Sequence, residues 1–401
     1  MSELSYLEKL MDGVEVEWLP LSKVFNLRNG YTPSKTKKEF WANGDIPWFR
    51  MDDIRENGRI LGNSLQKISS CAVKGGKLFP ENSILISTSA TIGEHALITV
   101  PHLANQRFTC LALKESYADC FDIKFLFYYC FSLAEWCRKN TTMSSFASVD
   151  MDGFKKFLIP RPCPDNPEKS LAIQSEIVRI LDTFSALTAE LTAELNMRKK
   201  QYNYYRDQLL SFKEGEVEWK MLGDLGENLD SKRKPITSGL REAGSIPYYG
   251  ASGIVDYVKD YIFDGDFLLI SEDGANLLAR NTPIAFSISG KSWVNNHAHV
   301  IKFDSYAERR YVEYYLNSID LAPYISGAAQ PKLNKKNLES IRIPNPSPED
   351  KERIVSILDK FDALTNSINE GLPREIELRQ KQYEYYRDLL FSFPRPETAS
   401  N

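Results

Sequence analysis

The sequence is poor in the residues from which most metal and redox sites are built. It has four His and six Cys in 401 residues, all six Cys lie in the first half, and no two have CxxC spacing. A zinc site or disulfide framework is therefore not expected, and the Cys residues are interpreted as small buried apolar side chains. The GxGxxG and Walker A motifs are also missing, and four scattered His suggest no Ser/His/Asp arrangement. We expect no catalytic residue, no metal and no cofactor.

Long apolar runs and a strong charge of one sign are missing too. No stretch approaches the roughly 20 apolar residues that span a bilayer, and the N-terminus lacks the layout of a signal peptide, so a cytoplasmic location is expected. The net charge is −4, but residues 20–165 carry 19 basic and 14 acidic residues, and residues 220–345 carry 15 of each. The acidic excess lies in the remaining segments. Charge therefore permits nucleic-acid binding by a local patch without indicating it.

What the sequence does contain is a long internal repeat. Ile177–Thr188 recurs as Ile354–Thr365 with nine of 12 positions identical, and Arg198–Phe212 recurs as Arg379–Phe393 with 11 of 15 identical. Weaker matches cover the rest, so the chain is two copies of one unit, a divergent globular part followed by a similar helical part. The end of the first copy leads into the start of the second copy at the central join. The end of the second copy would lead into the start of the first in the same way if the two termini were joined. This circular order predicts that the termini lie close in space.

The repeated segments are predicted to be long helices. Between Ile177 and Phe212 the apolar positions alternate steps of four and three, the coiled-coil period. Tyr202 and Tyr205 fall on this seam and are interpreted as core residues. The second copy contains Gly371-Leu-Pro373, where a kink or break is expected. The predicted domains are a first globular domain at 1–165, a central spacer helix at 166–213, a second globular domain at 214–348, a C-terminal helix at 349–393 and a tail at 394–401.

The globular parts show short β-type runs, frequent turn signals and some helical stretches, which favour an α+β class with an irregular sheet. Loop clusters of basic, amide and aromatic residues occur at matching places in both copies and are the candidate DNA contacts, because Lys and Arg suit phosphates and guanine while Asn and Gln suit adenine. In the first domain these are Asn29, Tyr31, Thr32, Lys35, Lys37, Lys38, Arg50, Ser87, Thr88, Gln106 and Arg107. In the second domain they are Lys232, Arg233, Lys234, Tyr248, Tyr249, Ser271, Glu272, Asp273, Asn296 and His297.

Glu272 and Asp273 directly follow a predicted strand and allow three interpretations. They could hold a metal for a nuclease, accept a hydrogen bond from a cytosine amino group, or form a solvated loop. In the helices, Tyr204 and Tyr385 fall off the seam with Arg206 and Arg387 nearby. Tyr and Arg are enriched at interfaces, which favours a partner surface over a solvated face at these four residues.

The duplicated layout, Ser231-Lys-Arg-Lys-Pro-Ile236, Tyr248-Tyr-Gly-Ala251, Ile270-Ser-Glu-Asp-Gly-Ala275 and the helix ending Tyr-Tyr-Arg-Asp resemble type I restriction-modification specificity subunits. The resemblance covers nearly the whole chain. It implies two target recognition domains, each reading one half of a split, asymmetric DNA sequence. It also implies two long antiparallel helices that set the spacer in a circular, pseudo-two-fold arrangement.

The same resemblance implies that the helices dock two modification (methyltransferase) subunits, which bind S-adenosylmethionine, and that restriction subunits join this core. The family has no catalytic residues in this subunit, and we expect a non-catalytic chain without a metal. Two other hypotheses stay open: the recognition subunit of a related restriction-modification system, and a coiled-coil scaffold that binds proteins and not DNA.

Overall fold

A computed structural model describes residues 13–142, 147–327, 330–367 and 369–395. The chain divides into two compact units. Unit 1 comprises Met1–Ala189 and Leu378–Asn401, and unit 2 comprises Glu190–Glu377. The division differs from the domain prediction, because each helical segment belongs partly to each unit. Residues 1–12 of the predicted first domain and residues 396–401 of the predicted tail lie outside the described residues.

Unit 1 is built around a five-stranded sheet. Its order is β2 (Phe25–Asn29), β9 (Phe108–Leu113), β6 (Ser83–Ser87), β7 (His95–Ile98) and β4 (Ile60–Leu61). A three-stranded sheet contains β5 (Lys67–Ile68), β3 (Ile46–Phe49) and β8 (Leu103–Ala104), and two ribbons pair β1 (Val16–Pro20) with β12 (Leu158–Pro162) and β10 (Thr141–Thr142) with β11 (Ser148–Val149). The α-helices of its globular part are α2 (Leu21–Val24), α3 (Met51–Asn57), α4 (Ile123–Lys139) and α5 (Met151–Lys156).

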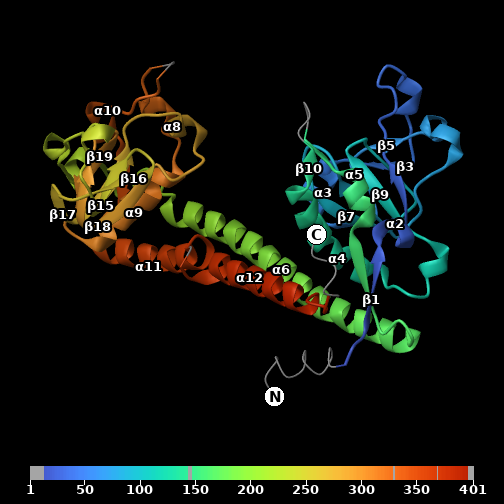
Figure 1. Cartoon of the computed structure of the whole chain (residues 1–401). Coiled ribbons are helices and arrows are strands. Elements are labelled where there is room, and N and C mark those ends of the chain that lie inside the picture. Colours follow the sequence, from blue (N-terminus) through green and yellow to red (C-terminus); the bar gives the residue numbers. More distant parts are fainter. Residues whose placement is uncertain (1–12, 143–146, 328–329, 368, 396–401) are drawn as a thin grey trace. The chain divides into compact units, whose positions relative to one another are not determined.

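Unit 2 is built around a six-stranded sheet. Its order is β14 (Glu227–Asn228), β19 (Ala298–Lys302), β17 (Phe263–Ser271), β18 (Ala285–Val294), β15 (Ala243–Gly250) and β16 (Gly253–Val258). A ribbon pairs β13 (Glu218–Met221) with β20 (Arg342–Asn345). The helices are α7 (Leu222–Leu225), α8 (Asn276–Ala279), α9 (Tyr306–Ser318), α10 (Lys335–Glu339) and α11 (Pro348–Thr365), and α9 packs on β18 and on α11 (Figure 1).

The two units share one topology. The order β2-β9-β6-β7 in unit 1 equals β14-β19-β17-β18 in unit 2, and every neighbouring pair is antiparallel. Residues 84–86 of the central strand β6 and residues 267–270 of the central strand β17 are continuous apolar runs because both faces of the sheet are covered there. Ile84 and Ile86 pack into one core cluster and Leu85 into another, and Leu268 and Leu269 likewise divide between two clusters. The predicted α+β class and internal duplication are confirmed.

The central helix α6 runs unbroken from Pro167 to Leu210, 44 residues, or roughly 66 Å at 1.5 Å per residue. In unit 1 its Phe184 ring stacks on Tyr386 of α12 (Gly371–Leu390) at 5.3 Å. In unit 2 its Tyr205 stacks on Phe361 at 5.7 Å, yet Tyr205 is 46% exposed. The interpretation of Tyr205 as a core residue is therefore wrong, since almost half of this residue is exposed.

The second helical segment is divided. Helix α11 ends at Thr365 and α12 begins at Gly371. Gly371 has a φ of 73°, and a Cβ there would lie 2.3 Å from the carbonyl oxygen of Ala363, so only glycine fits this turn. Pro373 lies in the first turn of α12, where a missing N–H is tolerated.

The predicted closeness of the chain ends is confirmed within unit 1. The Trp18 indole donates a hydrogen bond to the Pro394 carbonyl at 3.0 Å, and Phe391 packs on Phe125 at 5.3 Å. The N-terminal ribbon and the C-terminal residues thus share one core. Among the residues that the structure describes, no helix is both long and apolar enough to cross a membrane.

Candidate nucleic-acid interface

In unit 2, three loops meet at Glu272, the residue that follows β17. Its backbone N–H donates to the carbonyl of His297, in the turn between β18 and β19, at 2.9 Å. Its own carbonyl accepts from the N–H of Leu333, just before α10, at 2.8 Å. The side chain of Asn295 accepts from the N–H of His297 at 2.8 Å and fixes that turn. These bonds hold the three loops at one edge of the sheet.

Unit 1 builds the same junction at Thr88, which follows β6. Thr88 donates its N–H to the carbonyl of Arg107 at 2.9 Å and accepts from the N–H of Val149 at 3.0 Å. Asn105 accepts from the N–H of Arg107 at 3.0 Å, as Asn295 does in unit 2. The two copies therefore present equivalent loop clusters although their side chains differ.

A buried ion-pair network underlies the unit 2 cluster. Arg233 donates to the Glu272 carboxylate at 2.6 Å and lies 3.3 Å from Asp230. Lys332 reaches the other Glu272 oxygen at 3.0 Å. The fully buried His299 contacts Asp230 through Nδ1 at 2.6 Å and the Leu333 carbonyl through Nε2 at 2.7 Å. Each charge has a partner, as buried charges require.

The partners decide the ionisation of both carboxylates. Burial raises the pKa of Glu272, but the hydrogen bonds from Arg233 and Lys332 outweigh it and place that pKa below its ordinary value. Burial likewise raises the pKa of Asp230, but the hydrogen bond and charge of His299 lower it further than burial raises it. Both groups are carboxylates at neutral pH, and each depends on its cation.

Asp230, Glu272 and His299 place their ligand atoms within 4.8 Å of one another, which is close enough to hold a metal ion. The countercharge that a metal would supply already comes from Arg233 and Lys332. The side chains therefore fit an ion-pair network better than a metal site.

Unit 1 has a neutral version of this network. The Thr109 hydroxyl donates to the Asn29 side chain at 3.0 Å and lies 3.1 Å from the Thr88 hydroxyl. Thr109, Asn29 and Thr88 correspond to His299, Asp230 and Glu272, respectively, because the members of each pair occupy equivalent positions in the strand pairing of the two sheets. The neutral set has no strong metal ligand. The charged network thus belongs to unit 2 and is not a shared feature of the fold.

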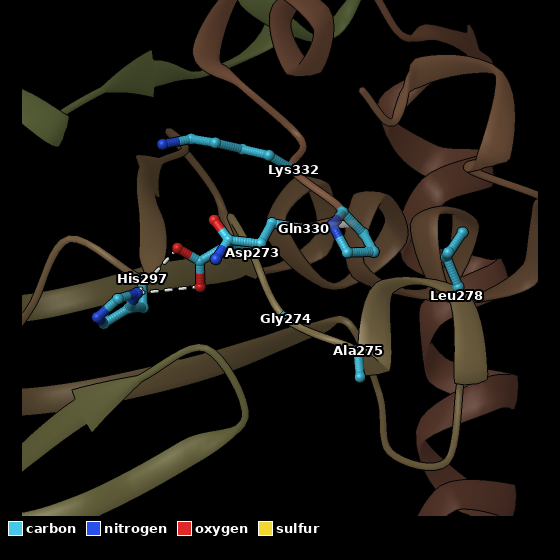
Figure 2. Close-up of a pocket in the computed structure, with 8 residues that line it drawn as sticks. Asp273, Gly274, Ala275, Leu278, His297, Gln330 and Lys332 are labelled. Carbon is cyan, nitrogen blue, oxygen red and sulfur yellow. Dashed lines mark hydrogen bonds and ion pairs between the residues drawn. The ribbon is translucent and has the colours of Figure 1, made fainter. Parts of the chain in front are cut away.

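A pocket of about 640 Å³ adjoins the unit 2 network at Lys332. Figure 2 shows Asp273, His297 and Lys332 on one side of it and Ala275 and Leu278 on the other. The Asp273 carboxylate accepts from the His297 ring at 2.9 Å. Lys332 and His297 are each half exposed. The pocket therefore offers an acceptor, a cation and an apolar wall to a ligand.

The structure separates the predicted DNA contacts into three groups. The buried ones are Ser87, Tyr248, Ser271 and Glu272. The half-buried ones are Tyr31, Thr32, Arg50, Thr88, Arg233, Tyr249 and Asp273. The exposed ones are Asn29, Lys35, Lys37, Lys38, Gln106, Arg107, Lys232, Lys234, Asn296 and His297.

The buried residues need correction, because their polar atoms are used inside the fold. The Ser87 hydroxyl donates to the Ser89 carbonyl, the Ser271 hydroxyl donates to the Ala251 carbonyl, and the Tyr248 hydroxyl accepts from the Ile236 N–H. Glu272 and its partner Arg233 hold loops together and have no free edge for a base. Lys332 is a further residue of the site that no local sequence pattern indicates, because its role depends on its ion pair with Glu272, far away in the sequence.

On the helices, Tyr204 and Tyr385 are 62% and 58% exposed, which agrees with their predicted off-seam positions. Arg206 and Arg387 are mostly covered, and each forms an ion pair with the Asp that follows it. The two sites have the same local geometry, since each tyrosine meets the next one edge-on at 5.4 Å. They stay a predicted partner surface.

Fold and site together define a class: proteins with two copies of one sheet-rich unit, each presenting an equivalent polar loop cluster and each joined to a long helix. The chain matches the model of the type I restriction modification DNA specificity domain at residues 13–198 and again at 214–378. It belongs to this family, whose role is the recognition of DNA sequence.

Relatives and solved structures that resemble this chain are also specificity subunits of type I restriction-modification systems. The specificity subunit of the Escherichia coli type I restriction enzyme EcoprrI is 70% identical over 381 residues, covering 92% of this chain and 93% of the relative. That of EcoR124I/EcoR124II, also from Escherichia coli, is 42% identical and both chains are fully covered. The crystal structure of an S subunit from M. genitalium superposes with a TM-score of 0.58 at 16% identity, over 96% of this chain and 98% of that one. At that identity the likeness shows the fold alone.

Proposed function

We propose that this chain is the specificity subunit of a type I restriction-modification complex and that each unit reads one half of a split DNA target. The observation that carries the proposal is the duplication of the loop cluster, with Thr88 and Glu272 at equivalent junctions and different side chains around them. Two loop clusters with the same backbone arrangement and different side chains suit two half-sites of different sequence.

The second part of the proposal concerns the binding of partner subunits by the helices. Two exposed tyrosines, Tyr204 and Tyr385, lie at equivalent positions of the repeat and suit two copies of one partner. We propose that they dock two modification subunits, that those subunits bind S-adenosylmethionine, and that restriction subunits join the assembly. The chain itself is proposed to be non-catalytic and to need no cofactor.

The test is genome-wide mapping of N6-methyladenine in cells that express a methyltransferase partner with and without this chain. The proposal expects a split motif with a fixed gap that is methylated only when the chain is present. An active methyltransferase whose methylation pattern does not depend on the chain would overturn the recognition role and favour a protein-binding scaffold.

A further inference from the structure

The unit 2 pocket has a chemistry that selects among ligands. Asp273 and Lys332 line the pocket, and the Lys332 ammonium group pairs at 3.0 Å with Glu272, the carboxylate that precedes Asp273 in the chain. A phosphate would meet the Asp273 carboxylate beside an ammonium group that Glu272 already neutralises. The edge of a base carries no net charge, so the carboxylates do not repel it, and it can bind both a carboxylate acceptor and an ammonium donor.

The groups also have an arrangement. In Figure 2 the Asp273 carboxylate lies beside the His297 ring, on the same side of the pocket as the Lys332 side chain, and Ala275 and Leu278 form the opposite wall. The pocket thus presents an acceptor and a donor on one side and an apolar surface on the other. Lys332 donates one hydrogen bond to Glu272 and keeps two N–H donors for a ligand.

One base pair suits a carboxylate and an ammonium group on one side of a pocket. A cytosine–guanine pair presents the N4 amino donor of cytosine beside the O6 acceptor of guanine in the major groove, and the C5 edge of cytosine next to N4 carries no acceptor. Adenine places its N7 acceptor beside its N6 amino group, and N7 would face the acceptor-only carboxylate. The carboxylate therefore favours cytosine, paired with guanine.

We propose that this pocket reads one cytosine–guanine pair of the target, with Asp273 accepting from cytosine N4 and Lys332 donating to guanine O6. The inference rests on the proposed function of the chain as a DNA reader. His297 is a positioning residue here, because its ring N–H donates to Asp273 at 2.9 Å and orients the carboxylate. Glu272 is a second positioning residue, since its backbone and side chain join all three loops of the pocket.

The experiment uses the assembled complex of the full chain with its methyltransferase partner. Its variants are Asp273→Asn, Asp273→Ala and Lys332→Met, and Asp304→Asn is the control because Asp304 is an exposed carboxylate outside the pocket lining. Methylated motifs are mapped for each, and binding is measured to duplexes with every single-base change in the target.

The proposal predicts a change at one base pair of one half-site, the same pair for all three variants. Asp273→Ala and Lys332→Met should each lose discrimination there on the order of 10- to 100-fold. Asp273→Asn should admit adenine at the cytosine position, because an amide side chain pairs with N6 and N7 together. The other half-site and the gap should not change, and Asp304→Asn should equal the wild type.

Three results would overturn the inference while leaving the proposed function intact. They are an unchanged motif with unchanged single-base preferences, a change in the half-site read by unit 1, and an affinity that falls equally for every duplex. If methylation is lost altogether, the duplex series still decides between a single-position effect and a uniform one. A wild-type complex without any split motif would instead contradict the proposed function.

Discussion

Replacing Arg233 by Met distinguishes a structural arginine from a DNA contact. The sequence pattern places Arg233 among the basic residues that reach DNA, but its side chain is only 13% exposed and pairs with Asp230 and Glu272. Arg233→Met keeps most of the volume and removes the charge. Two buried carboxylates then lose a cation.

The magnitude follows from what each carboxylate retains. Removing one partner of a buried pair destabilises by about 3–5 kcal/mol. Glu272 keeps Lys332 and Asp230 keeps His299, so the lower end applies, about 3 kcal/mol. For a unit of this size that corresponds to a melting temperature lower by roughly 6–12 °C. The transition of unit 2 should carry the loss, and differential scanning calorimetry measures it.

The loss should also depend on pH in a defined direction. The pKa values of Asp230 and Glu272 lie below the ordinary 3.8 and 4.5. Their contribution is therefore present above those values and disappears as the pH falls through the lowered ones. The difference in melting temperature between wild type and variant should shrink between pH 7 and pH 3, because protonated carboxylates need no cation.

Lys234→Met is the matched control, since Lys234 is an exposed cation in the same loop. It should leave the melting temperature within about 0.5 kcal/mol of wild type. If Arg233→Met were as stable as that control and instead reduced the salt dependence of DNA binding by about one phosphate contact, the assignment of Arg233 to the internal network would be refuted.

Three further predictions concern the helices. In calorimetry, Asp359→Asn should destabilise unit 2 by about 2 kcal/mol and Asp182→Asn should destabilise unit 1 by about 1 kcal/mol. The second effect is smaller because the cation paired with Asp182 is more than a third exposed, whereas the cation paired with Asp359 is mostly covered. A larger loss for Asp182→Asn would contradict this. One more Thr-Ala-Glu-Leu unit after Leu195 adds about 6 Å of helix and should widen the methylated gap by about one or two base pairs of 3.4 Å, and an unchanged gap would exclude a ruler role. Tyr204→Ala and Tyr385→Ala should leave melting within about 0.5 kcal/mol of wild type but weaken binding of the modification subunit in calorimetric titration, and undiminished binding would exclude a docking role.

Much of the fold could be predicted because the repeat is a strong signal. Near-identity of Ile177–Thr188 and Ile354–Thr365 forces similar packing, and the heptad period identifies long helices. The closeness of the chain ends followed from the order of the repeat alone. The exposure of Tyr205 was not predicted, because the coiled-coil period identifies positions that face a partner helix. It does not say how much of the side chain other segments cover.

The unit 2 loop cluster was only partly predictable. Loop position and residue type correctly indicated Asp273 and His297 as accessible, but Glu272, directly adjacent, is buried by Arg233 and Lys332. Burial of a polar loop residue depends on partners 39 and 60 positions away in sequence, and local patterns hold no information on such pairs. The equivalence of Thr88 with Glu272 became visible only through backbone hydrogen bonds, because the side chains share no chemistry.

The proposed reading of one half-site by each unit can be tested by exchanging a single unit. Residues 222–341, which lie between the two strands of the β13–β20 ribbon, are replaced with the corresponding segment of a relative whose methylated motif differs, and N6-methyladenine is then mapped. One half-site should change to that of the relative while the other half-site stays the same. A folded, active chimera in which both half-sites change, or neither does, would contradict it.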